Sequence, residues 1–201
     1  MDAKLTAIIV HDLKNSLGVL EGELRDLTIA PESDRALRAY QTCVSLREKL
    51  VGFLMLYKAS SQGLSARIEA VSPQDFLNAL LKQHAAGRTG LRVSLNATAM
   101  PALGFFDENL VSLALEAALQ NATRFARTTI EVSCTNDAGD LVFAIRDDGA
   151  GLGTQEDKPS TGLGMELCEA IARAHCKGEK TGTAVLCNRP EGGALFELRL
   201  P

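Results

Sequence analysis

The N-terminal part of the chain carries two apolar series at alternating spacings of three and four residues, and these constrain the fold most. One series is Val10, Leu13, Leu17, Leu20, Leu24 and Leu27, and the other is Ala36, Ala39, Cys43, Leu46, Leu50, Phe53 and Tyr57. Such spacing places a narrow apolar stripe on a helix that packs almost parallel to a neighbour. Because Pro31 separates the series, residues 1–66 are predicted to form an antiparallel helical hairpin, with Ser33 or Asp34 capping its second helix.

A single hairpin cannot bury the apolar stripes of both of its helices. Two hairpins can bury them together by forming a four-helix bundle. The sequence therefore predicts a homodimer that is joined through residues 1–66, the first of two domains.

Residues 67–201 follow a different pattern and are predicted to form the second domain. Helices are expected from Pro73 to about His84, from an Asp107 cap to about Phe125, and from Leu163 to about His175. Alternating segments predict strands at 65–71, 91–95, 128–134, 141–146, 184–188 and 194–200. This mixture predicts an α+β fold, in which helices cover one face of a mostly antiparallel sheet.

Composition excludes several classes of partner and site. The net charge is −4 and no basic stripe occurs, so nucleic acid is not an expected partner. No apolar run approaches the roughly 20 residues of a membrane span, and the first residues do not resemble a signal peptide. The 5 cysteines are scattered without a CxxC pair, which predicts free buried thiols in a reducing cytoplasm rather than a metal cluster or disulfides.

Two glycine-rich segments indicate a nucleotide site. The first, residues 147–153, ends a predicted strand with Asp147 and contains Gly149 and Gly151, and the second, residues 161–165, opens a predicted helix. Glycines allow the backbone to approach a ligand closely, and a helix N-terminus offers free N–H groups to phosphate. A strand-end carboxylate can accept a hydrogen bond from the exocyclic amine of adenine. The segments match neither the Rossmann nor the P-loop pattern.

The preceding helix adds polar groups suited to the same ligand. Asn121 and Arg124 lie one turn apart on one face, and Glu116 is expected near that side. Amide and carboxylate oxygens are ligands that Mg²⁺ accepts, and arginine binds phosphate.

Taken in order, these motifs resemble those of a known family. Asn121–Phe125, Asp147–Gly151 and Gly162–Gly164 resemble the N box and the two glycine boxes of the histidine kinase ATPase domain, a fold shared with gyrase, Hsp90 and MutL proteins. His11–Asn15 resembles the H box of the kinases' dimerisation and phosphotransfer domain. The resemblance covers nearly the whole chain.

The resemblance implies a role for each motif residue. Asp147 would bind the adenine amine, Asn121 with Glu116 would hold Mg²⁺, Arg124 would contact phosphate, and Phe125 would line the pocket. The loops around ATP would be shaped by Gly149, Gly151, Thr161, Gly162, Leu163 and Gly164. His11 would accept phosphate from ATP and pass it to an aspartate in the receiver domain of a response regulator.

The apolar stripe gives an independent expectation for the H-box residues. If Val10 and Leu13 face the core, His11 and Asn15 lie outside the stripe, one turn apart, and Asp12 also points outward. An exposed neutral imidazole keeps a lone pair for attack. Asp12 is expected to orient the ring or to accept its proton. The resemblance to the family further implies that Asn15 positions water for dephosphorylation of the partner's aspartate.

The sequence departs from the family pattern in three places, which keep two alternatives open. Ser16 stands where the H box usually has proline, Ala117 where the N box often has a second polar ligand, and the lid, residues 154–160, is short and lacks phenylalanine. A short lid is expected to hold nucleotide less firmly. The alternatives are an ATP-independent histidine phosphotransferase that relays phosphate between response regulators, and a dimeric scaffold without catalysis. The intact glycine boxes favour the kinase.

Overall fold

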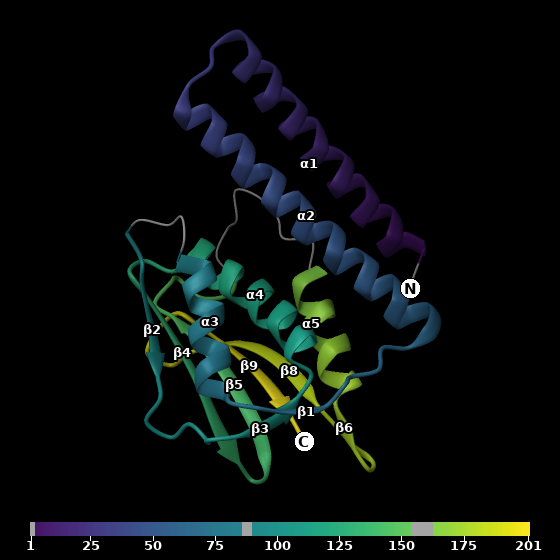
Figure 1. Ribbon diagram of the computed structural model, residues 1–201, viewed down its shortest axis with the longest axis vertical. Coiled ribbons are helices and arrows are strands. Elements are labelled where there is room, and N and C mark those ends of the chain that lie inside the picture. The colour runs from purple at the N-terminus through teal and green to yellow at the C-terminus, as the bar shows by residue number, and fades with distance from the viewer. Residues whose placement is uncertain (1–2, 86–89, 154–162) are drawn as a thin grey trace. The chain divides into compact units, whose positions relative to one another are not determined.

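The computed structural model describes residues 3–85, 90–153 and 163–201. The chain divides into two compact units, the first ending at Gly63 and the second comprising most of the chain from Leu64 onward. A pair of helices forms the first unit, and helices with a mixed sheet form the second (Figure 1). The predicted α+β architecture is confirmed.

The first unit is an antiparallel hairpin of α1 (Ala3–Ile29) and α2 (Ser33–Gln62). Helix α1 continues through Ser16 without interruption. The predicted cap of α2 was wrong, because Glu32 occupies the N-cap position and makes no capping hydrogen bond with its side chain. The carboxylate of Glu32 pairs instead with Arg35 at 3.2 Å.

Each apolar stripe of the hairpin divides into a covered half and an exposed half. On α1, Leu20 is buried and Leu13 and Leu27 are half-buried, whereas Val10, Leu17 and Leu24 are 50%, 47% and 47% exposed. On α2, Ala39 is buried and Leu46 and Phe53 are half-buried, whereas Leu50 and Tyr57 are exposed. Packing of α1 against α2 therefore uses only alternate members of each series.

The second unit is built on a five-stranded sheet in the order β2-β4-β5-β9-β8. Its strands are β2 (Arg92–Asn96), β4 (Thr129–Asp137), β5 (Asp140–Asp147), β8 (Thr183–Asn188) and β9 (Ala194–Leu200). All neighbours in this sheet are antiparallel except β2 and β4. Two small antiparallel pairs complete the unit, β1 (Glu69–Val71) with β3 (Gly104–Phe106) and β6 (Cys176–Lys177) with β7 (Lys180–Thr181).

One face of the sheet is covered by α3 (Pro73–Ala85), α4 (Glu108–Phe125) and α5 (Leu163–Ala174) (Figure 1). Phe76, Phe106 and Phe143 meet edge to face between these layers, with ring centroids 5.2–6.0 Å apart. Asp107 caps α4 as predicted, and its carboxylate accepts a hydrogen bond from the Leu110 amide at 3.0 Å. The aromatic cluster thus packs α3 against the sheet, and the cap fixes the start of α4, the helix that carries the N box.

The sequence predicted the longer elements better than the shorter ones. Strand β1 is shorter than the predicted segment 65–71, and β3 and the β6–β7 pair were not predicted. Strands β4 and β5 are longer than predicted, since only Ala138 and Gly139, both with positive φ, form the turn between them. Short strands lack a repeating pattern long enough to be recognised.

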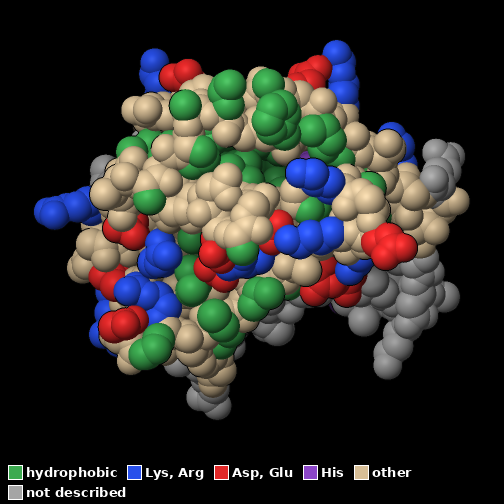
Figure 2. All heavy atoms as spheres, turned by 90° about the horizontal axis from the view of Figure 1, so that it is seen from below, with side chains coloured by type: hydrophobic (Ala, Val, Ile, Leu, Met, Phe, Trp, Pro, Cys, Tyr) green, Lys and Arg blue, Asp and Glu red, His purple; other side chains and the backbone are tan. Residues whose placement is uncertain are grey.

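Surface and cysteine properties agree only in part with the sequence analysis. None of the described helices is long and apolar enough to cross a membrane. On the face shown in Figure 2, side chains of both charges are intermixed beside a hydrophobic cluster. All 5 cysteines are free, but only Cys134 and Cys168 are buried, which raises the pKa of each thiol to about 12; the prediction of buried thiols was wrong for Cys43, Cys176 and Cys187.

Candidate nucleotide and phosphoacceptor sites

Asp147, the residue predicted to bind adenine, ends β5 and is buried. Its Oδ1 atom accepts hydrogen bonds from the backbone amides of Gly149, at 2.8 Å, and Ala194, at 3.2 Å. The Ala194 amide belongs to β9, the strand beside β5. The carboxylate is therefore held in one orientation by its own loop and by the neighbouring strand.

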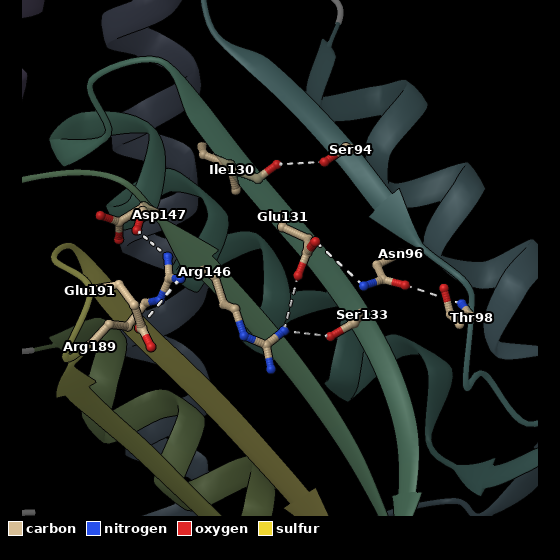
Figure 3. Close-up of polar contacts among 10 residues, drawn as sticks. All are labelled: Ser94, Asn96, Thr98, Ile130, Glu131, Ser133, Arg146, Asp147, Arg189 and Glu191. Atoms are coloured by element: carbon tan, nitrogen blue, oxygen red, sulfur yellow. Dashed lines mark hydrogen bonds and ion pairs between the residues drawn. The ribbon is translucent and has the colours of Figure 1, made fainter.

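The turn between β8 and β9 supports this loop, and the sequence analysis did not anticipate its role. The Arg189 guanidinium donates to the Asp147 carbonyl oxygen at 3.1 Å, and Gly193 lies so close that a Cβ atom would overlap the same oxygen. Figure 3 shows Arg189 beside Asp147, whereas Arg146 turns toward Glu131 and Ser133. The sequence signalled only a turn at Gly192-Gly193.

Asn188, the last residue of β8, makes the second contact between this turn and the glycine-rich loop. Its side-chain amide accepts a hydrogen bond from the Leu152 amide at 2.5 Å and donates one to the Leu152 carbonyl at 3.4 Å. Gly151 has a φ of 82°, and a Cβ atom at this position would clash with Asn188. The positive φ favours glycine at 151, and a side chain there would also displace Asn188 from its contact with Leu152.

Asp148 binds the same loop to the end of α4. Its carboxylate accepts hydrogen bonds from the amides of Arg127, at 2.8 Å, and Thr128, at 3.0 Å, and from the Thr128 hydroxyl. The Thr128 hydroxyl, followed by its amide, is the main reason that the pKa of Asp148 lies well below its usual range. A Cβ atom on Gly149 would overlap the Phe125 carbonyl oxygen. The first glycine box and the N box are thereby in direct contact.

The N-box residues occupy the last two turns of α4. Asn121 and Phe125 are half-buried, and Arg124 is exposed with its guanidinium 5.1 Å from the centroid of the Phe125 ring, in a cation–π arrangement. One turn before Asn121, Ala117 faces Gly164 at the start of α5. This face of α4 therefore points toward the second glycine box.

The donors on α4 fit Mg²⁺ only as part of a shared coordination shell. Glu116 accepts a hydrogen bond from the Ser112 hydroxyl at 3.3 Å, and its separation from Asn121 turns it about 140° around the helix. Among the described residues, no group of three or more His, Cys, Asp and Glu side chains gathers to hold a metal. Mg²⁺ commonly takes one or two protein oxygens and completes its shell with phosphate and water, so the Asn121 amide oxygen suits it.

Part of the second glycine box and the lid lie outside the described residues. These are Thr161, Gly162 and residues 154–160. Leu163 is buried at the start of α5, and the following residue, Gly164, is exposed with room for a side chain.

His11 and Asn15 lie together on the exposed side of α1, as predicted. The side-chain nitrogens His11 Nδ1 and Asn15 Nδ2 are 3.1 Å apart. An amide nitrogen only donates, so in this arrangement Nδ1 accepts and Nε2 carries the hydrogen. If the amide turns over, its oxygen accepts from Nδ1–H, which leaves the lone pair on Nε2.

The predicted outward direction of Asp12 was wrong. Asp12 is half-buried, and its carboxylate faces α2, where Lys49 Nζ lies 2.9 Å from Oδ2. The apolar series did not reveal this contact, since Lys49 lies outside the stripe of α2.

Comparison with known proteins supports the class that this geometry suggests. Residues 106–201 match the family of histidine kinase-, DNA gyrase B- and HSP90-like ATPases. The chain is 26% identical over 220 residues to the sensor protein KdpD of Escherichia coli strain K12, covering 98% of this chain and 24% of KdpD. It therefore spans about a quarter of the length of that relative.

Solved structures extend the likeness to both units. The histidine kinase AdeS of Acinetobacter baumannii matches with a TM-score of 0.71 and 20% identity, covering 94% of this chain and 96% of AdeS. The histidine kinase ThkA, solved in complex with the response regulator TrrA, matches with a TM-score of 0.68 and 14% identity, covering 99% of this chain and 61% of the solved one. The fold and site define an ATPase unit of the histidine kinase and Hsp90 type joined to a helical hairpin. Residues 106–201 thus belong to the histidine kinase-, DNA gyrase B- and HSP90-like ATPase family, and the fold of the chain as a whole is that of histidine kinase catalytic cores.

Proposed function

We propose that this chain transfers the γ-phosphoryl group of Mg-ATP to His11 and then passes it to an aspartate in a response regulator. The observation that carries the proposal is the support of the Asp147 loop from three sides, by the segment that follows α4, by β9 and by the β8–β9 turn. A loop fixed in this way holds the Asp147 carboxylate in a set orientation for the adenine ring of a nucleotide. The exposed His11 supplies an acceptor within the same chain.

The nucleotide is held by groups from several elements. Asp147 accepts the hydrogen bond from the adenine amine, Phe125 lines the base pocket, and Arg124 contacts phosphate. The loops that enclose ATP contain Gly149, Gly151, Thr161, Gly162, Leu163 and Gly164. Asn121 holds Mg²⁺ together with the phosphates, whereas Glu116 lies about 140° around α4 and would have to reach the ion through water. Bound Mg²⁺ neutralises charge on the transferred group.

At His11, the ring nitrogen with the free lone pair forms a bond to the γ-phosphorus. The bond from phosphorus to the bridging oxygen breaks, and ADP leaves with that electron pair. The second ring nitrogen then loses its proton to a base, for which Asp12 is the nearest carboxylate along the chain. The product is a phosphoramidate, which is labile in acid.

Labelling tests the acceptor. Incubation with γ-labelled Mg-ATP is expected to give acid-labile label in the wild-type chain and none in His11→Gln. Equal labelling of the variant would show that another residue accepts the phosphate. His84, half-buried on α3 beside Thr123, provides the matched control, since His84→Gln is expected to keep the label.

Nucleotide titration tests the ATP site and separates the kinase from the ATP-independent relay and from the scaffold. Asp147→Asn is expected to abolish measurable binding, because an amide in that position presents the wrong hydrogen-bonding group to the adenine amine. Unchanged affinity would remove the adenine contact from the proposal. Wild-type protein that binds no nucleotide but exchanges phosphate with a receiver domain would be a relay.

The response regulator is proposed as the partner by analogy with ThkA, whose structure was solved with TrrA. Exposure of His11 on α1 leaves it accessible to such a partner. Asn15, one turn away, is proposed to position water for dephosphorylation of the partner's aspartate. The phosphorylated partner is expected to decay more slowly with Asn15→Ala than with wild type. Equal decay rates would dismiss this role.

The exposed halves of the two apolar stripes support a homodimer. Val10, Leu17, Leu24, Leu50 and Tyr57 would be covered by the same residues of a second hairpin in a four-helix bundle. Sedimentation at micromolar concentration is expected to give the mass of a dimer, whereas a monomer would contradict this assembly.

A further inference from the structure

Four polar residues at and near the phosphoacceptor form two pairs on α1. Residues four apart share a face of a helix, so His11 lies with Asn15 and Asp12 lies with Ser16. The first pair is exposed, whereas the second is half-buried and faces α2. The acidic neighbour of His11 therefore belongs to a different face from His11 itself.

Lys49 of α2 joins both members of the inner pair. Its ammonium group lies 2.9 Å from the Asp12 carboxylate and 2.9 Å from the Ser16 hydroxyl. The side chains of Lys49 and Asp12 are 37% and 32% exposed, so water screens this contact only in part. Ser16 supplies an acceptor that proline, which stands here in related H boxes, would lack.

In this arrangement the Asp12 carboxylate, the nearest candidate to take a proton from His11, is already bound to Lys49. A general base must lie within hydrogen-bonding distance of the proton that it accepts. In the hairpin the Asp12 carboxylate is directed toward Lys49, and the imidazole contacts Asn15 instead.

We propose that Lys49 and Ser16 lock Asp12 in an inactive position, and that Asp12 must leave Lys49 before it can accept the ring proton of His11. Lys49 is a positioning residue in this scheme, because it acts on the reaction only through Asp12. The inference rests on the proposed phosphorylation of His11. The bonds made and broken are those given above, and the lock controls only the transfer of the proton from the ring nitrogen to the Asp12 carboxylate.

A contact between helices could also serve only to stabilise the hairpin, and this alternative predicts the opposite result. If Lys49 only stabilises, its loss should slow phosphorylation or leave it unchanged. If it locks Asp12, its loss should speed phosphorylation. The KM for ATP provides a further check on the locking role. Because Lys49 lies in the hairpin, its loss should leave the KM for ATP unchanged.

The test compares initial rates of His11 labelling at saturating Mg-ATP in the full chain. Lys49→Met is expected to raise the rate about two- to fivefold, the range that breaking one partly exposed ion pair can produce. Ser16→Ala, which keeps the ion pair, should give a smaller rise, and Lys49→Arg should restore the wild-type rate. Lys58→Met, the same change at an exposed position of α2, is the control and should leave the rate unchanged.

A second background shows whether the effect passes through Asp12. In Asp12→Asn, adding Lys49→Met should produce no acceleration, and acceleration that persists would overturn the lock. If wild type is labelled and Lys49→Met is labelled no faster, the lock is overturned but the proposed function is not. Absence of label from wild type and every variant would overturn the proposed function, and the lock with it.

Discussion

The hairpin and the ATPase unit differ in how completely each buries its apolar side chains. The ATPase unit encloses large residues such as Leu119, Phe143 and Leu198 completely. In the hairpin, alternate members of both stripes, including Leu17 on α1 and Tyr57 on α2, remain exposed. One sequence therefore specifies a unit that buries its own apolar side chains and another whose exposed stripes the proposed homodimer would cover.

The largest expected effect comes from placing a charge on the exposed stripe. Leu17→Glu is expected to weaken the dimer by about 3 kcal/mol, or roughly 100-fold in Kd, because the bundle would enclose an unpaired carboxylate in each chain. Sedimentation over a dilution series would measure the change.

Val185→Glu is the matched change in the ATPase unit, since Val185 on β8 is 49% exposed. It should leave the dimer constant unchanged and alter stability by no more than about 0.5 kcal/mol. Similar weakening by both substitutions would remove the contrast between the two units.

The next largest effect is a pH dependence of the stability of the ATPase unit, which arises from His175. The buried His175 accepts a hydrogen bond at Nε2 from the Asp107 amide, at 3.0 Å, and Nδ1 lies 2.8 Å from the Ile171 carbonyl. Burial lowers the pKa of His175 below the usual range of a histidine, although the Ile171 carbonyl and the Asp107 carboxylate act in the opposite direction. The folded unit thus favours the neutral ring, which ties the start of α4 to the last turn of α5.

Linkage then fixes the sign of the pH dependence. Below pH 6.5 the unfolded chain binds a proton that the folded unit excludes, so the free energy of unfolding should fall as pH decreases. The slope contributed by this group should approach about 1.4 kcal/mol per pH unit until the folded-state pKa is reached. Denaturant titrations of wild type and His175→Gln would test this, because the variant should lack that contribution. Parallel profiles would contradict it.

The smallest effect concerns helix capping, which also differs between the units. Asp107 caps α4 with its side chain, but Glu32 at the start of α2 does not cap. Glu32→Ser should therefore stabilise the hairpin by about 0.5–1 kcal/mol, and Asp107→Ala should destabilise the ATPase unit by a similar amount or more. Thermal unfolding would measure both. Destabilisation by Glu32→Ser would show that the pair of Glu32 with Arg35 outweighs a cap.

The sequence predicted features that repeat or that follow a known order of motifs. The apolar series predicted both long helices, and the positions of Asp107 and Pro73 predicted the starts of α4 and α3. The contact between His11 and Asn15 followed from helical spacing alone. Local periodicity sets these features, so one stretch of chain is sufficient to reveal them.

Contacts between distant positions were not predictable in this way. Lys49 meets Asp12 across 37 positions, and Arg189 meets the Asp147 carbonyl across 42. No local sequence pattern around any of these residues indicates its distant partner. The requirement for glycine at 193 likewise depends on where β5 ends, which the turn residues themselves do not show.

The place of β9 in the sheet has a consequence for synthesis of the protein. This strand lies between β5 and β8, yet the ribosome makes it after the other four strands of the sheet. Its residue Ala194 and the adjoining Gly193 also complete the surroundings of Asp147. A nascent chain that has emerged only as far as β8 consequently has an incomplete sheet and lacks part of the support of the Asp147 loop. Under the proposed function, nucleotide would therefore assist folding only after β9 has left the exit tunnel.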